Sequence, residues 1–257
     1  MLFKRIPSLY LSVSVLLFGG CVFESSAPTE SIDSEIARLQ ARAESITIIR
    51  DDFGVPHIYG KTDADAVFGM LYAQAEDDFP RIEQNYIWAT GRLAEVEGEA
   101  AIYSDLRARL YMTIDEAKAA YEAAPQWLKD LCDAYADGLN WYLNTHPDVE
   151  PRLLTKFEPW FPMFFSEGSI GGDIERISLR DIEAFYGGYG AGFPVAAAVR
   201  EPRFVEPKGS NGFAISGEHT ASGNAMLLIN PHTSFFFRGE VHVVSEEGLN
   251  AYGAVTW

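Results

Sequence analysis

A stretch rich in glycine and proline, residues 187–209, restricts the fold of this chain more than any other feature of its sequence. Such a composition interrupts regular helices and strands and is typical of an exposed linker. The hydrophobic pattern also changes across it, from helical spacing before residue 187 to short alternating runs after residue 209. We therefore expect a linker between two regions of different secondary structure, residues 35–186 and 210–257.

The first region opens with a pattern typical of a hairpin. Residues 46–49 and 55–59 read as strands, and the Asp-Asp-Phe-Gly sequence at 51–54 reads as the turn between them. The region that follows is predicted to be mostly helical.

Helix start signals recur after the hairpin. Thr62 with Asp65 and Thr113 with Glu116 have the spacing of capping boxes. The first of these helices is expected to run to about Asp77, and Pro80 should restart it. Apolar residues at helical spacing predict a longer helix through Leu128, Leu131, Tyr135, Leu139 and Tyr142.

Beyond the linker the pattern favours β-structure. The predicted strands are residues 213–216, 226–229, 241–244 and 252–255, with a turn at 222–224. A sheet begun in this way has an unpaired edge and an uncovered face at Trp257, so we interpret the sequence as truncated.

The first residues read as an export signal rather than as part of the fold. Residues 1–21 contain two basic residues, an apolar stretch and a Gly-Gly pair before Cys21. The Phe-Gly-Gly-Cys sequence resembles a bacterial lipobox, so an acylated Cys21 and a soluble periplasmic product both stay open. Residues 22–34, which are rich in polar residues and proline, are predicted to be a flexible tether.

Charge and cysteine content exclude several classes of function. The net charge of −17 opposes binding to nucleic acid or to an anionic lipid surface. Cys132 is the only cysteine beyond Cys21, so the mature chain has neither an internal disulfide nor a cysteine metal site. Cys132 lies on an apolar helical face and is predicted to be a buried hydrophobic residue.

Two stretches carry more specific patterns. The first spans most of residues 46–98 and includes IRDDFGVPHIYG at 49–60, DADA at 63–66, YAQAED at 72–77 and GRLAE at 91–95. The second is GSNGFA at 209–214 followed by LINPH at 228–232.

Together and in this order, the two stretches resemble the N-terminal part of the penicillin acylase family of N-terminal-nucleophile hydrolases. The resemblance implies an α+β fold, the αββα sandwich, with residues 35–186 in the α-subunit and residues 210–257 beginning the β-subunit. It also implies that the precursor cuts itself between Gly209 and Ser210. The two products would then remain together as a heterodimer.

The residue types suit this chemistry. A serine hydroxyl needs a base, and the new α-amine of Ser210, with an ordinary pKa of about 7.7–8.0, can serve its own hydroxyl. Gly209 tolerates the strained backbone that attack on its carbonyl requires.

The resemblance assigns further residues. His232 would orient the amine and nucleophile, although a strand-end histidine bonded to backbone is the alternative. Phe235, Phe236 and Phe237 either line an apolar acyl-binding cleft or belong to the core. Glu175 is the candidate α-subunit ligand for the structural calcium that some members bind. No organic cofactor is required.

We therefore expect a periplasmic hydrolase that cleaves a small N-acyl compound. A β-lactam side-chain amide, an acyl-homoserine lactone and a lipopeptide are all open as substrates, with quorum-signal or fatty-acyl amides favoured. The oxyanion donors should lie beyond Trp257, so the 257-residue chain alone is expected to be inactive. The alternatives are a non-catalytic periplasmic or lipid-anchored binding protein and an inert truncated product.

Overall fold

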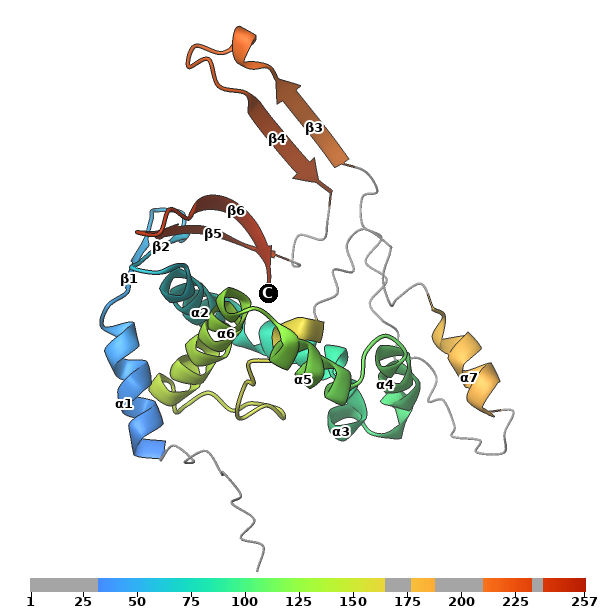
Figure 1. Ribbon diagram of the computed structural model, residues 1–257. Coiled ribbons are helices and arrows are strands. Elements are labelled where there is room, and N and C mark those ends of the chain that lie inside the picture. The colour runs from blue at the N-terminus through green and yellow to red at the C-terminus, as the bar shows by residue number, and fades with distance from the viewer. Residues whose placement is uncertain (1–31, 165–176, 188–209, 233–237) are drawn as a thin grey trace, which may run out of the picture.

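The computed structural model describes residues 32–164, 177–187, 210–232 and 238–257 (Figure 1). Its α-helices are α1 (Ile32–Ala43), α2 (Asp63–Ala89), α3 (Leu93–Glu97), α4 (Ile102–Arg109), α5 (Ile114–Ala123), α6 (Gln126–Thr145) and α7 (Leu179–Gly187). Its strands are β1 (Thr47–Arg50), β2 (Pro56–Gly60), β3 (Ser210–Ile215), β4 (Met226–Pro231), β5 (Arg238–Ser245) and β6 (Asn250–Thr256). Short 3₁₀ turns lie at Glu99–Ala101, Phe161–Phe164 and Gly217–His219.

Four of the strands form one sheet in the order β1-β2-β5-β6. The hairpins β1–β2 and β5–β6 are antiparallel, and they join through a parallel pairing of β2 with β5. This pairing places His57 opposite His242 and Ile58 opposite Val243. One sheet is thus assembled from segments on both sides of residues 187–209.

Helix α2 covers one face of this sheet, and α6 packs against α2 (Figure 1). The sheet side of the interface buries Ile58, Val241 and Val243 together with Ala66 of α2. A larger aromatic core lies between α2, α6 and the segment that follows α6. Its large members are Leu71, Phe79, Ile82, Tyr86, Ile87, Leu139, Tyr142, Phe157 and Phe161.

The two long helices approach closely at a glycine of α6. A β-carbon at Gly138 would lie 2.5 Å from the backbone oxygen of Phe68 in α2, which is closer than real β-carbons come to backbone oxygen. The absence of a side chain at position 138 therefore sets the distance between the helices.

The local helix signals are confirmed. Both predicted capping boxes form, with Thr62 accepting from the Asp65 backbone N–H and Thr113 accepting from that of Glu116. Asp78 leaves the helical conformation two residues before Pro80, so α2 is two helices that meet at a kink. The interruption and restart predicted around Pro80 are present.

The α+β class, the opening hairpin, the predicted strands and the burial of Cys132 are also confirmed. Burial raises the pKa of the Cys132 thiol to about 11, consistent with an unreactive core residue.

One boundary differs, because α1 begins at Ile32, inside the predicted tether 22–34. The acidic first turn and the basic last turn of α1 interact favourably with the helix dipole. This favours a helix start at Ile32 although the preceding residues are polar and rich in proline. None of the helices in the described ranges is long and apolar enough to cross a membrane.

Candidate active site

The segment that contains the predicted nucleophile forms a two-stranded ribbon. Strands β3 and β4 pair antiparallel, with Ser210 opposite Pro231, Asn211 opposite Asn230 and Ile215 opposite Met226. Figure 1 shows this ribbon apart from the four-stranded sheet. The register brings the first residue of β3 and the residue after β4 to the same open end.

The connection between the two strands explains why the chain reverses here. The Thr220 hydroxyl donates to the backbone oxygen of Asn224 at 2.8 Å, and the Asn224 backbone N–H donates to the Ser222 hydroxyl at 3.3 Å. Gly223 has a φ of 74°, a left-handed conformation that glycine adopts at little cost. These contacts hold the register that brings Ser210 and His232 to the same end of the ribbon.

The open end of the ribbon is the candidate active site. Ser210 begins β3 there, and His232 directly follows β4. The side-chain amide nitrogen of Asn211 lies 3.2 Å from Nε2 of His232. A nucleophile, an imidazole and an amide therefore gather at one end of two paired strands. Sequence reasoning assigned no role to Asn211, and only its place directly after the serine could have drawn attention to it.

The ribbon exposes most of its apolar side chains. Phe213 of β3 is 64% exposed and Leu227 of β4 is 70% exposed, and Met226, Leu228 and Ile229 are exposed as well. An exposed apolar surface of this kind is typical of one that contacts another segment or another protein.

Several predicted site residues lie outside the described part of the chain. Gly209, the predicted calcium ligand Glu175, and Phe235, Phe236 and Phe237 all belong to this group. Their roles remain predictions, as do the calcium site itself and the linker beyond Gly187.

A pair of histidines lies where the two hairpins of the four-stranded sheet meet. Nδ1 of His57 in β2 and Nδ1 of His242 in β5 are hydrogen-bonded at 2.9 Å, with the rings edge to face. Nε2 of His57 lies 3.5 Å from Asp51, and Nε2 of His242 lies 3.1 Å from Oδ1 of Asn250. In the described ranges, no three His, Cys, Asp or Glu side chains are grouped so that they could hold a metal ion. We read this cluster as part of the sheet junction.

The carboxylate beside this pair is stabilised in its charged form. Desolvation would raise the pKa of Asp51, but the backbone N–H groups of Phe53 and Val55, together with His57, lower it below its ordinary value. Asp51 thus closes the β1–β2 turn as an ionised acceptor.

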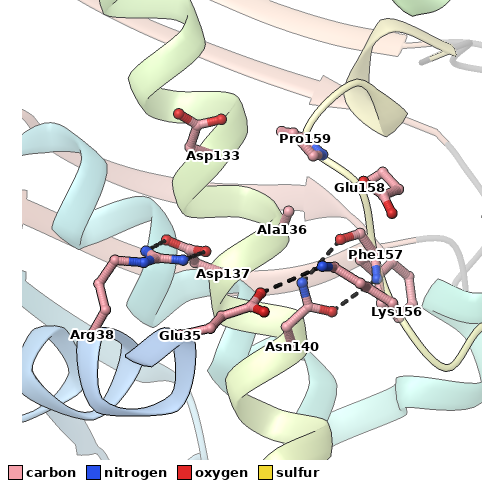
Figure 2. Close-up of a pocket in the computed structure, with 10 residues that line it drawn as sticks. All are labelled: Glu35, Arg38, Asp133, Ala136, Asp137, Asn140, Lys156, Phe157, Glu158 and Pro159. Atoms are coloured by element: carbon pink, nitrogen blue, oxygen red, sulfur yellow. Dashed lines mark hydrogen bonds and ion pairs between the residues drawn. The ribbon is translucent and has the colours of Figure 1, made fainter. Parts of the chain in front are cut away.

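A separate hollow of about 280 Å³ lies between α1, α6 and the loop around residue 157 (Figure 2). Arg38 donates two hydrogen bonds to Asp137, at 2.6 and 2.9 Å. Asn140 both donates to the Phe157 carbonyl and accepts from its N–H, at 2.9 and 2.8 Å. Because these polar groups satisfy one another, the hollow is a structural junction rather than a site built around a ligand.

The family described as penicillin amidase matches residues 45–257. Among curated relatives, acyl-homoserine lactone acylase QuiP of Pseudomonas fluorescens is 30% identical over 138 residues, which are 54% of this chain and 17% of the relative. Acyl-homoserine lactone acylase PvdQ of Pseudomonas savastanoi pv. phaseolicola is 26% identical over 252 residues, which are 84% of this chain and 30% of the relative. The chain spans less than a third of the length of these relatives.

Among solved structures, a thermostable penicillin G acylase from Alcaligenes faecalis aligns with a TM-score of 0.43 and 23% identity. The alignment covers 47% of this chain and 69% of the acylase chain. The family match is continuous from the opening hairpin through the ribbon and on to β6.

Proposed function

The chain belongs to the penicillin amidase family, and on that premise we propose that it is the N-terminal part of a self-processing amidohydrolase with Ser210 as nucleophile. The observation that carries the proposal is the β3–β4 register, which brings Ser210 and His232 to one end of the ribbon inside the matched region. The curated relatives that are named acylases support the same class of reaction.

The first step is cleavage of the chain itself. The Ser210 hydroxyl attacks the carbonyl carbon of Gly209, the C–N bond breaks, and the acyl group moves from nitrogen to oxygen. Water then hydrolyses the ester, leaving a carboxylate on Gly209 and a free α-amine on Ser210. This amine has an ordinary pKa of about 7.7–8.0, so near neutral pH a useful fraction can accept a proton.

Hydrolysis of substrate repeats the chemistry on another carbonyl. The α-amine takes the hydroxyl proton as the Ser210 oxygen attacks the substrate amide, and the proton passes to the leaving amine as the C–N bond breaks. Water, deprotonated by the same amine, then releases the acyl group. We propose a fatty-acyl amide as substrate, with an N-acyl-homoserine lactone as the first compound to test, because the curated relatives carry that name.

We further propose that residues 1–21 direct export to the periplasm, where the protein is either soluble or lipid-anchored through Cys21. The two segments would remain together after cleavage as a heterodimer. The parallel β2–β5 pairing, which joins strands from both sides of residues 187–209, supports this arrangement.

Intact mass and N-terminal sequencing of the full-length protein test the proposal, beside Ser210→Ala and the control Ser216→Ala, an exposed serine directly after β3. We expect the wild type and the control to yield a chain that starts Ser-Asn-Gly-Phe and to release acyl groups from the lactone. Ser210→Ala should stay uncut and inactive. A wild-type protein that remains one chain would refute the self-processing mechanism and favour a non-catalytic binding protein.

A further inference from the structure

The contact between Asn211 and His232 bears on how the imidazole takes part in the proposed reaction, and the inference therefore rests on the proposed function. The amide nitrogen of Asn211 faces Nε2 of His232 at 3.2 Å. An amide nitrogen carries only donors, so the ring nitrogen that it faces must offer a lone pair. In a neutral imidazole the proton is then on the other ring nitrogen, Nδ1.

The ribbon geometry makes this contact a consequence of the strand register. Asn211 pairs with Asn230 across the ribbon, and the contact between Asn211 and His232 places the residue after β4 on that same face. His232 thus follows β4 on the face of Asn211, whereas Ser210 begins β3 on the other face. The Asn211 side chain is therefore placed to hold the ring while Nδ1 points away from it.

We propose that Asn211 is a positioning residue that fixes the proton of His232 on Nδ1. His232 is then a hydrogen-bond donor at the end of the ribbon where Ser210 lies, and it is not the general base. This assignment fits a mechanism in which the α-amine of Ser210 already supplies the base. It also explains why an amide, rather than a carboxylate, follows the serine.

Substitution of Asn211 by aspartate tests which ring nitrogen of His232 must carry the proton. A carboxylate accepts and cannot donate, so Nε2 must then carry a proton, and in the neutral ring Nδ1 becomes an acceptor instead of a donor. Nδ1 would still donate only in the imidazolium, which the neighbouring negative charge favours as the pH falls. In Asn211→Asp we expect kcat to fall about tenfold to a hundredfold, with KM little changed and the pH–rate profile altered. Asn211→Gln, which keeps the donor, should recover most of the rate, and Asn211→Ala should lie between.

The experiment uses the full-length protein and measures self-cleavage by intact mass and the hydrolysis of an N-acyl-homoserine lactone against pH. Asn224→Asp, the same change at the far end of the ribbon, is the control and should match the wild type. A wild-type rate and pH profile in Asn211→Asp would overturn the inference while leaving the proposed function intact. A wild-type protein that neither cuts itself nor hydrolyses the lactone would refute both.

Discussion

Arg50 and Asp51 hold the opening hairpin in place through opposite charges. Arg50 donates to Glu76 of α2 at 3.0 Å, which ties the end of β1 to that helix. Asp51 accepts from the backbone N–H groups of Phe53 and Val55 at 2.9 and 3.0 Å, which closes the turn. Two adjacent residues thus fix both the shape of the hairpin and its attachment.

The lowered pKa of Asp51 predicts how its contribution to stability depends on pH. A carboxyl whose pKa is lower in the folded chain than its unfolded value, about 3.9, stabilises the fold above that value. The stabilisation is lost as the pH falls through the folded pKa. We therefore expect Asp51→Ala to lower the urea midpoint clearly at pH 7 and less below about pH 4.

Urea unfolding of the wild type and Asp51→Ala at several pH values checks this expectation. Asp52→Ala is a neighbouring control, because Asp52 is exposed. An equal loss of stability at pH 7 and at about pH 2 would show that the charge of Asp51 is not involved.

Helix α2 contacts both the sheet and several other helices, and its buried Glu83 binds the loop that follows α6. Glu83 is almost fully buried and accepts backbone hydrogen bonds from Arg152, Leu153 and Leu154 at 3.0, 2.7 and 2.9 Å. These N–H groups would otherwise lack a partner beside the aromatic core. Glu83 thus adds three hydrogen bonds to the aromatic contacts that hold the segment after α6 against α2.

Substitution of Glu83 should therefore be costly. In Glu83→Gln one acceptor oxygen becomes a donor that faces a backbone N–H, and we expect the free energy of unfolding to fall by about 1–3 kcal/mol. Glu83→Ala leaves all three N–H groups unsatisfied and should cost more. Glu122→Gln, on the exposed side of α5, should change the value by less than about 0.5 kcal/mol. A urea midpoint for Glu83→Gln equal to that of the wild type would contradict this account.

The elements that sequence reasoning predicted are those with local signals. Thr62 with Asp65 and the break before Pro80 depend on residues within one or two helical turns, so they can be read directly from the chain. The hydrogen bond between His57 and His242 joins residues 185 positions apart, and no local pattern indicates it. The role of Glu83 likewise depends on where a distant loop lies. The motif led to Ser210 and His232 as predicted site residues, whose roles stay predictions, and it gave no reason to single out Asn211.

At the scale of the whole molecule, segments on both sides of residues 187–209 share one sheet and one core. Besides the β2–β5 pairing, Gln74 of α2 donates to the backbone oxygen of Thr256 at 3.0 Å. The Ser245 hydroxyl donates to Asp63 at 2.5 Å. The two segments are therefore joined by strand pairing, by buried apolar side chains and by polar contacts.

This shared sheet predicts that the segments stay associated after cleavage. We expect both chains to co-elute in gel filtration, and Ile58→Ala, which truncates a fully buried side chain at the junction, to cost about 2–5 kcal/mol. The cleaved variant should separate at a lower urea concentration than the cleaved wild type. Ile49→Ala, on the exposed side of the same hairpin, is the control. Separation of the wild-type chains without denaturant would refute the prediction.

The parallel junction between β2 and β5 also has a kinetic consequence. In the uncut chain, the long connection between these strands keeps them at a high effective concentration, so their pairing is a unimolecular step. Once the peptide bond before Ser210 is broken, the same pairing becomes a second-order encounter whose rate depends on dilution. The cleaved protein would then stay assembled because the two chains separate slowly. Cleavage would have to follow folding, and the separated chains could not regain the unimolecular folding route of the precursor.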